Sequence, residues 1–331
     1  MKAILMTAIG NPDVLAVHDI AEPTITAATQ IKVKLKAAGV NPVDTKVRHN
    51  GVFYSQSLPA VLGCDGAGEV IEIGTAAGRF KLGDKVWFCN GGLGREQGNY
   101  AEVTVLDQRW ASLMPDTLSF AEAAALPLVL ITAWGALFDR GGLQAGQTVL
   151  IHAGAGGVGH VAIQLAKLKG ARVITTVSSE EKVAFVKSLG ADDVALYKPN
   201  GFADAVNQLT HGKGADVVFD TVGAAVFKES IAITAHFGRL ITILDPGSLD
   251  LTEARMRNLL IGFELMLTPM LRDLHEARDK HVEILNACRS YIEQGLLKVY
   301  VSQRFPLEQA ALAHASIEAG HTQGKIVLEI A

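Results

Sequence analysis

Residues 149–159, with the sequence VLIHAGAGGVG, constrain the fold of this chain more than any other segment. The first residues are typical of a buried parallel strand, and the glycines that follow form a G-x-G-x-x-G pattern. An amphipathic stretch then predicts a helix that ends at Gly170. Strand, glycine turn and helix together are the parts of a dinucleotide site, in which backbone N–H groups hold the pyrophosphate. The residues expected to contact the cofactor here are Gly154, Ala155, Gly156, Gly157, Val158 and Gly159. A Cβ branch at Gly156 or Gly159 is expected to occupy the place of the pyrophosphate.

The composition excludes several classes of protein. The 331 residues are 49% apolar and 19% charged, which is enough for a sizeable core. The net charge of -4 gives no basic field to attract nucleic acid. Cys64, Cys89 and Cys288 are widely spaced without a C-x-x-C pair, so neither a zinc ribbon nor a disulfide framework is encoded. We therefore expect a cytoplasmic protein with no membrane contact. The longest uncharged stretch, residues 123–138, is short for a membrane span and predicts a buried helix.

The texture of the sequence changes near Leu118. Before it, short strands predominate, and residues 31–36 alternate apolar and basic side chains as in a half-buried strand. After it, apolar strands alternate with helical patterns, which indicates a parallel sheet covered by helices. The expected strands of this sheet are 148–152, 172–177, 194–197, 217–220 and 239–243.

Several segments resemble the medium-chain dehydrogenase/reductase superfamily, and most of all its zinc-independent quinone oxidoreductase branch, the zeta-crystallin-like proteins. They occur in family order: AGVNPVD at 38–44, GCDGAGEV at 63–70, GDKV at 83–86, LP at 126–127, TA at 132–133, AGAGGVG at 153–159 and GKIVL at 324–328. The resemblance implies an α/β fold. A GroES-like β-barrel catalytic domain is formed by both chain ends, and a Rossmann domain with a doubly wound parallel sheet is inserted between them. The expected boundaries are 1–122 and 269–331 for the catalytic domain and 123–268 for the Rossmann domain.

The positions that bind zinc in zinc alcohol dehydrogenases are filled differently here. By the resemblance they are Asn41, Cys64 and approximately Leu128. A catalytic Zn²⁺ needs three ligands of the Cys, His or Asp/Glu type, so an amide, one thiol and an alkyl chain are not a zinc site. Asp65 or Asp44 with His49 is an alternative ligand set, but its spacing is wrong. We expect no metal, and a conjugated hydride acceptor such as a quinone or an enone, since oxidation of an alcohol is hard without a Lewis acid.

The choice of nicotinamide cofactor depends on the end of the second Rossmann strand. NAD sites usually place an Asp or Glu about twenty residues after the glycines, but residues 175–179 carry no acid. Ser178, Ser179 and Lys182 are instead suited to hold a 2′-phosphate, which favours NADPH. An alternative interpretation is that Ser178-x-x-Glu181 is a capping box for the next helix, and both interpretations are compatible.

Other site residues follow from the resemblance alone. Asn41 and Asp44 line the nicotinamide pocket, and Thr132 approaches the carboxamide. The Asn41 amide has a donor and an acceptor and is suited to bind a substrate carbonyl, whereas Asp44 alternatively fixes the turn after Pro42. Further cofactor contacts are expected at Tyr197, which is alternatively an ordinary strand-end tyrosine, and at Val222, Leu244 and Lys325.

The proton donor is left open by the sequence. Tyr54 is the only phenol near this segment, but Phe53 takes the place of the family's tyrosine in an ungapped match. Lys46 and solvent are other proton sources.

Three functions follow in order of preference. The first is an NADPH:quinone or enone reductase without zinc, with Asn41, Asp44 and Tyr54 as its catalytic residues. The second is an alcohol dehydrogenase with residual metal. The third is a non-catalytic, crystallin-like protein that binds NADPH. The apolar residues 259–267 predict a last strand of the Rossmann sheet with an open edge, through which two copies form a homodimer. An alternative interpretation is that the C-terminal helix of the same chain covers this edge.

Overall fold

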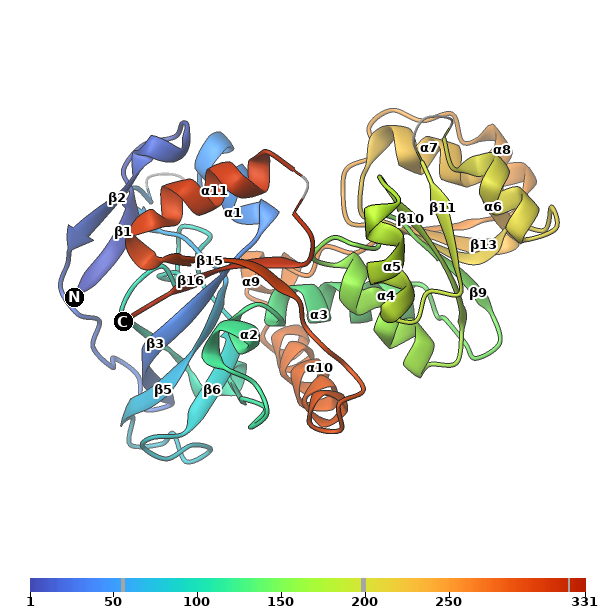
Figure 1. Ribbon diagram of the computed structural model, residues 1–331. Coiled ribbons are helices and arrows are strands. Elements are labelled where there is room, and N and C mark those ends of the chain that lie inside the picture. Colours follow the sequence, from blue (N-terminus) through green and yellow to red (C-terminus); the bar gives the residue numbers. More distant parts are fainter. Residues whose placement is uncertain (55–56, 198–200, 321) are drawn as a thin grey trace. The chain divides into compact units, whose positions relative to one another are not determined.

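The computed structural model describes residues 1–54, 57–197, 201–320 and 322–331, which fold into two compact units (Figure 1). Unit 1 comprises Met1–Leu128 and Leu267–Ala331, and unit 2 comprises Val129–Met266. The boundary expected after residue 122 falls inside helix α2 (Phe120–Ala124), which packs against strands β3 and β5 of unit 1.

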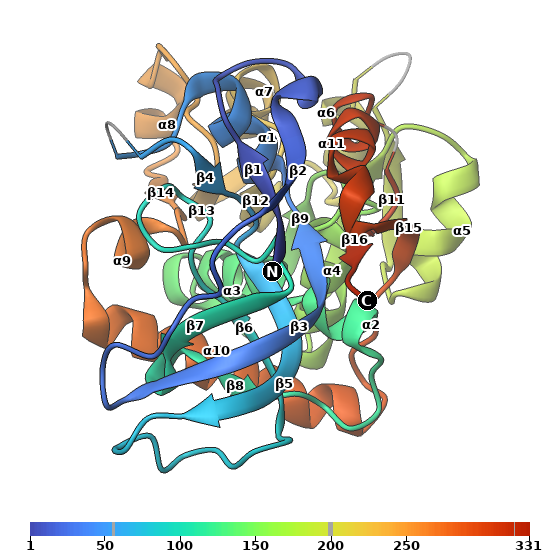
Figure 2. The same cartoon turned by 90° about the vertical axis from the view of Figure 1, so that its left-hand side faces the viewer.

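Unit 1 contains a sheet in which both parts of the chain take part (Figure 2). Its strand order is β15-β16-β3-β5-β6-β8, and β7 also pairs with β3. The last strand, β16, runs antiparallel to β3, with Ile326 opposite Val40. The strands are β3 (Gln30–Val40), β5 (Asp65–Ile73), β6 (Lys85–Cys89), β7 (Val103–Asp107), β8 (Ser112–Leu113), β15 (Val301–Pro306) and β16 (Lys325–Glu329).

Smaller elements complete unit 1. A second sheet has the order β2-β1-β4, formed by β2 (Leu15–Asp19), β1 (Lys2–Met6) and β4 (Ala60–Val61). The helices besides α2 are α1 (Pro42–Asn50), α9 (Thr268–Leu271), α10 (His275–Glu293) and α11 (Ala310–Glu318).

Strand β3 shows how the alternating pattern folds. Ile31, Val33 and Leu35 are buried, as the apolar face predicts. Lys32 is also buried, because its ammonium pairs with Glu72 at 2.9 Å and Glu22 at 3.2 Å. A strand expected to bury only its apolar face therefore buries a lysine of its polar face as well, since two carboxylates neutralise the ammonium.

Unit 2 is built on a six-stranded parallel sheet with the order β11-β10-β9-β12-β13-β14. In chain order this is the 3-2-1-4-5-6 arrangement of doubly wound sheets, so the predicted α/β fold class is confirmed. Its strands are β9 (Thr148–Ile151), β10 (Arg172–Val177), β11 (Asp193–Leu196), β12 (Ala215–Asp220), β13 (Thr234–Thr242) and β14 (Leu260–Phe263). Its helices include α4 (Gly159–Leu168), α5 (Glu181–Ser188), α6 (Ala203–Leu209), α7 (Ala224–Ile233) and α8 (Thr252–Met256).

The uncharged stretch 123–138 was expected to be one buried helix and is not. Helix α2 ends at Ala124, and α3 (Pro127–Trp134) begins anew at the proline. Proline has no N–H to continue a helix but fits the first helical position, so Pro127 separates the two helices. No helix in the described parts of the chain is long and apolar enough to cross a membrane.

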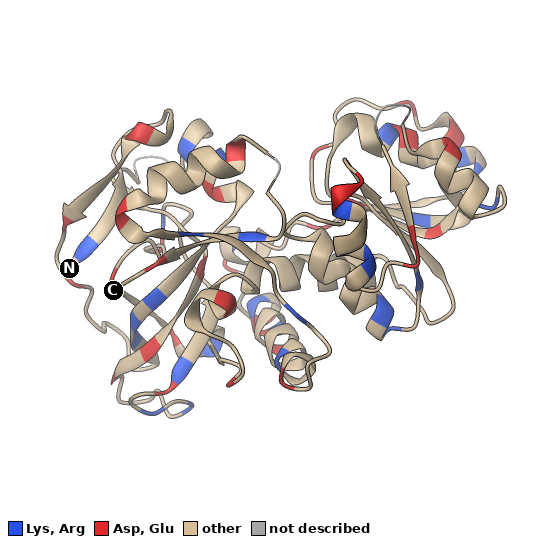
Figure 3. Cartoon of the chain, in the orientation of Figure 1, with Lys and Arg blue, Asp and Glu red and all other residues tan. Residues whose placement is uncertain are grey.

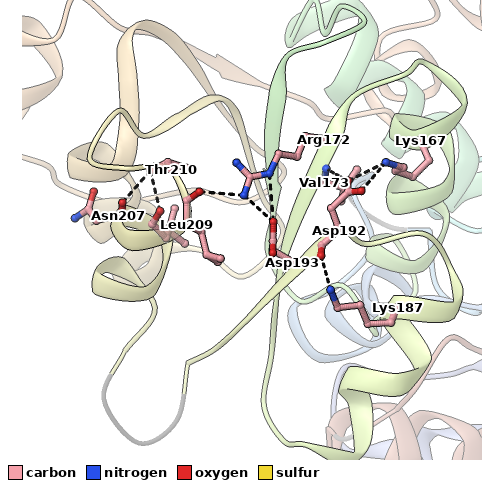
Figure 4. Close-up of polar contacts among 10 residues, drawn as sticks. Lys167, Arg172, Val173, Lys187, Asp192, Asp193, Asn207, Leu209 and Thr210 are labelled. Carbon is pink, nitrogen blue, oxygen red and sulfur yellow. Dashed lines mark hydrogen bonds and ion pairs between the residues drawn. The ribbon is translucent and has the colours of Figure 1, made fainter.

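Charged side chains of unit 2 lie mostly on its helices and at strand ends, and β9 and β14 carry none (Figure 3). At the amino ends of β10 and β11 these charges bind one another (Figure 4). Arg172 pairs with Asp193 at 2.7 Å and donates to the carbonyl of Leu209 at 3.0 Å, and Lys167 pairs with Asp192 at 2.8 Å. These contacts tie two strands to the helices α4 and α6.

Candidate functional site

The glycine turn between β9 and α4 presents free backbone donors. Gly154 donates its N–H to Thr176 at 3.0 Å, and Gly156 donates to Ala153 at 2.9 Å. The N–H groups of Ala155, Gly157 and Val158 have no acceptor among the described residues. Since they precede the first residue of α4, they lie at a positive helix end and are suited to bind a phosphate. The turn therefore fits the pyrophosphate of a dinucleotide.

The three glycines of the motif have different surroundings. A Cβ at Gly154 would meet Thr175 Oγ1, and one at Gly159 would meet the carbonyl oxygen of Ala153 and lie 2.7 Å from Gly154 Cα. A Cβ at Gly156 would meet only the Ala153 oxygen, at 3.2 Å. The expectation that a branch at Gly159 would occupy the ligand's place is therefore wrong, because that space already holds the turn itself. Of these three glycines, Gly156 leaves the most room for a Cβ, with this one close contact.

The end of β10 carries no acid, and the capping-box interpretation of Ser178 is wrong. Helix α5 begins at Glu181 with Glu180 as its N-cap, and no side chain caps it. The hydroxyls of Ser178 and Ser179 and the ammonium of Lys182 have no hydrogen-bond or ion-pair partner within the described residues. Capping fails because the chain makes a turn through 178–180 before the helix begins.

Three further predicted contacts follow strand ends in unit 2. Tyr197 comes directly after β11, Val222 shortly after β12 and Leu244 shortly after β13. Tyr197 and Val222 are exposed, and the N–H of Val222 is held by Asp220 Oδ1 at 2.9 Å. Because the carboxyl ends of parallel strands share one edge of the sheet, these residues gather on the edge where the glycine turn lies. The remaining prediction in this unit is Thr132, which is buried on α3.

Unit 1 holds Asn41, Asp65 and Lys325 in one buried group. Asn41 Nδ2 donates to Asp65 Oδ2 at 2.9 Å, and the Lys325 ammonium donates to Asn41 Oδ1. It also donates to the carbonyl of Val40 at 3.2 Å. Burial raises the pKa of Asp65 and lowers that of Lys325, and the attraction between the two charges opposes both shifts. Lys325, expected on the cofactor, thus contacts the Asn41 amide.

Asp44 belongs to a second chain of buried hydrogen bonds. Its Oδ2 accepts from the Asn41 N–H at 2.8 Å and from the Tyr100 hydroxyl at 3.0 Å, while Oδ1 has no partner. The Tyr100 hydroxyl also lies 3.2 Å from His314 Nε2. Burial raises the pKa of Asp44 to about 7 and lowers that of His314 to about 3. The bond to the Asn41 N–H is the turn-fixing contact that the sequence offered as an alternative.

Tyr54 does not join this group. Its hydroxyl lies 3.4 Å from the carbonyl oxygens of Met270 and Leu271, and the Arg95 guanidinium lies 5.9 Å from its ring centroid. The hydroxyl therefore donates to the last carbonyls of α9, rather than to the residues around Asn41.

Sequence reasoning missed the roles of Asp65, Tyr100 and His314. Asp65 offered a signal, because it is the one charged residue in the otherwise small and apolar run GCDGAG. Tyr100 and His314 offered none, since Tyr100 reaches Asp44 from 56 residues away along the chain and His314 reaches Tyr100 from 214 residues away. Their places are set by tertiary packing.

Comparison with known proteins identifies the family. A profile described as the alcohol dehydrogenase GroES-like domain matches residues 27–116, and one described as a zinc-binding dehydrogenase matches residues 189–328. A quinone oxidoreductase of Pseudomonas aeruginosa is 35% identical over 99% of both chains. The chain belongs to the quinone oxidoreductase branch of the medium-chain dehydrogenase/reductase superfamily. The GroES-like and Rossmann parts expected from the sequence are thereby confirmed.

Solved structures of the superfamily cover the whole chain. The Escherichia coli quinone oxidoreductase complexed with NADPH has a TM-score of 0.88 and 29% identity over 99% of this chain and 100% of that one. A structure described as an NAD-dependent alcohol dehydrogenase has a TM-score of 0.90 and 35% identity, with both chains fully covered. This quinone oxidoreductase branch thus has structural neighbours that carry different activity names.

Proposed function

We propose that the protein is an NADPH-dependent reductase of quinones or enones. The observation that carries the proposal is the end of β10, where residues 175–179 contain no acid and Ser178, Ser179 and Lys182 lie without partners in the described residues. Two hydroxyls and an ammonium are suited to bind a 2′-phosphate, provided that Glu180 and Glu181, which begin helix α5, point away from it. The free N–H groups of the glycine turn support the same proposal, as does the NADPH in the E. coli relative.

We further propose that the reaction proceeds without zinc. The residues at the zinc positions do not fit the metal, because the Asn41 amide is bound at both ends and Leu128 offers an alkyl chain. Cys64 is the single thiol of the set. Among the described residues, His, Cys, Asp and Glu side chains form no group of three that could hold a metal ion. The profile named for zinc binding begins at residue 189, so it spans none of these positions.

The residues suggest a division of labour at the reacting end. When bound, NADPH supplies the hydride. Asn41 keeps one Nδ2 hydrogen beyond its bond to Asp65, and this N–H is suited to bind the carbonyl oxygen of the acceptor. Asp44 holds the Asn41 backbone. Water, or Tyr54 after its hydroxyl leaves the carbonyls of Met270 and Leu271, protonates the reduced acceptor.

A turnover screen tests the proposal. Purified protein is mixed with NADPH or NADH and a panel of quinones, enones and simple alcohols, and the nicotinamide absorbance is followed. We expect NADPH oxidation with a conjugated acceptor and a lower kcat/KM with NADH. NADPH binding without turnover of any acceptor would instead identify the crystallin-like alternative.

The alcohol dehydrogenase alternative has one specific support, the fully covered structural neighbour of that name. It predicts that the protein reduces NAD⁺ with an alcohol and contains a stoichiometric metal. A chelator should then remove the metal and abolish this activity. Elemental analysis of the same preparation distinguishes the two functions.

We also propose a homodimer that forms through β14. This strand is last in the sheet order and pairs only with β13 on its inner side. Leu260, Phe263 and Leu265 on or beside it are exposed by 60%, 58% and 52%. An open edge with apolar side chains favours pairing with a second copy of the same strand across a two-fold axis.

A further inference from the structure

The Asn41 amide lies between two buried charges of opposite sign. Asp65 accepts from its nitrogen and Lys325 donates to its oxygen. Asn41 and Asp65 are 0% exposed and Lys325 is 3% exposed, so water does not compete for these bonds, and an acceptor reaches the second N–H of Asn41 only when the side chains that cover it move aside. No other side-chain amide of the described residues has a carboxylate and an ammonium as its two partners.

The sheet of unit 1 places the two charges. Lys325 is the first residue of β16, Asp65 is the first residue of β5, and both strands run antiparallel to β3. Their first residues therefore flank the last residues of β3, directly before Asn41. Asp65 is fixed further by the N–H of Leu128, which donates to its other oxygen at 2.8 Å.

The two charges determine which way the amide points. A carboxylate only accepts hydrogen bonds and an ammonium only donates them. Rotation of the amide by half a turn would place its oxygen against Asp65 and its NH₂ against Lys325, and both bonds would be lost. The orientation is therefore set by chemistry rather than by packing alone.

The same charges polarise the amide. The ammonium stabilises negative charge on Oδ1 and the carboxylate stabilises positive charge on Nδ2, so both favour the resonance form with a C=N double bond. Hydrogen bonds that polarise a group in this way strengthen its remaining bonds in a low-dielectric interior. The second Nδ2 hydrogen of Asn41 becomes a stronger donor as a result.

We propose that Asp65 and Lys325 are positioning residues that lock and polarise Asn41, so that its second N–H stabilises the oxyanion of a reduced carbonyl acceptor. This inference rests on the proposed function and deepens it. Hydride from NADPH forms a C–H bond at the conjugated carbon, an electron pair moves to the acceptor oxygen, and water then protonates that oxygen. A preorganised donor at the place where negative charge develops lowers the barrier of the first step. The substrate class is therefore a carbonyl compound conjugated to the hydride-accepting carbon.

Kinetics of three variants test the positioning role. Lys325→Met is expected to lower kcat by about 10- to 100-fold, as loss of a group that orients a reacting residue usually does. Asp65→Asn keeps the volume and hydrogen bonding but removes the charge, so we expect a smaller loss of kcat. Lys32→Met is the matched control, because Lys32 is also a buried lysine of unit 1 with carboxylate partners but does not contact Asn41. It should keep the wild-type kcat.

The dissociation constant of NADPH, measured beside kcat, distinguishes a positioning role of Lys325 from direct cofactor binding. A positioning role leaves the NADPH dissociation constant unchanged in Lys325→Met, whereas an unchanged kcat with weaker NADPH binding would show that Lys325 reads the cofactor and would overturn the proposal. If Lys325→Met does not fold, Asp65→Asn decides the matter, and a wild-type kcat in that variant overturns it.

Nuclear magnetic resonance gives a readout that does not need turnover. In protein labelled with ¹⁵N-asparagine, the side-chain signals of Asn41 are assigned by their loss in Asn41→Ala. We expect these signals to shift in Lys325→Met and Asp65→Asn but not in Lys32→Met. Unshifted signals would show that Asp65 and Lys325 do not hold the Asn41 amide, and would overturn the proposal even in an active enzyme. Shifted signals in a protein that reduces no quinone or enone would refute the proposed function, and with it the oxyanion role, while retaining the lock.

Discussion

Asp44 has one carboxylate oxygen that accepts two hydrogen bonds and one that accepts none. A proton on Oδ1 would leave both bonds to Oδ2 intact, which agrees with a pKa that burial raises to about 7. Below that pH we expect Asp44 to be a neutral carboxylic acid inside the folded protein. The neutral side chain still accepts the hydrogen bond from the Asn41 N–H, and it adds no second negative charge near Asp65.

The stability of the protein should therefore depend on pH through this residue. A carboxyl whose folded pKa is raised above its usual value of 3.8 stabilises the fold fully at low pH and loses that contribution as pH rises to about 7. Each unit of pKa shift corresponds to about 1.4 kcal/mol. Asp44→Asn keeps a neutral acceptor, so we expect the wild type to lose stability relative to this variant between about pH 4 and about pH 8. Urea unfolding of both proteins checks this, and parallel pH profiles would contradict it.

Lys182 allows a second test on single residues. Lys182→Ala should weaken NADPH binding by about 1–2 kcal/mol and leave NADH nearly unchanged, because only NADPH has the 2′-phosphate. Lys187→Ala is the matched control on the same helix, since its ammonium contacts the carbonyl of Asp192 (Figure 4). Fluorescence titration with both cofactors measures the effect. Equal losses of affinity for NADPH and NADH would show that Lys182 does not bind the 2′-phosphate.

At the scale of elements, we expect two glycines of the turn between β9 and α4 to differ in role, with Gly156 needed for cofactor binding and Gly159 for folding. Gly156→Val should weaken NADPH binding strongly and lower the melting temperature less than Gly159→Val, because a Cβ at Gly156 has one close contact, at 3.2 Å from the Ala153 oxygen. Gly159→Val should instead destabilise the fold by about 1–3 kcal/mol, since its Cβ would overlap the Ala153 carbonyl.

Thermal melts and NADPH titrations of the two variants are compared directly. A stable Gly159→Val protein that no longer binds NADPH would show that Gly159 contacts the cofactor after all. An equally destabilised Gly156→Val protein would contradict this difference in role.

Local sequence patterns were sufficient for elements that depend on near neighbours. The strands of unit 2 and the turn before α4 are encoded by apolar runs and by glycines at short spacing, and both were predicted. The start of α5 and the break at Pro127 were not, because a cap or a helix boundary depends on the path of a few backbone bonds. The partners of Asn41 lie in β5 and β16, so pairing of distant strands decides its chemistry, and no local pattern reports it.

At the scale of the whole molecule, the exposed strand β14 predicts the state of assembly. We expect a dimer at micromolar concentration, and we expect Ile261→Pro to dissociate it, because proline removes a backbone donor from an edge strand. Val17→Pro on the exposed strand β2 is a control with no expected effect on assembly.

Light scattering on the three proteins decides the matter. A monomeric wild type would refute the dimer, and an intact Ile261→Pro dimer would place the interface elsewhere. Circular dichroism confirms that each variant remains folded.

The pairing of β16 with β3 also has a consequence for the order in which the protein is made. A ribosome synthesises β3 and Asn41 early, then all of unit 2, and only afterwards Lys325. The Rossmann sheet has its full set of strands before the amide of Asn41 meets its ammonium partner. A nascent chain should therefore complete the glycine turn proposed to bind the nucleotide before it completes the buried group around Asn41.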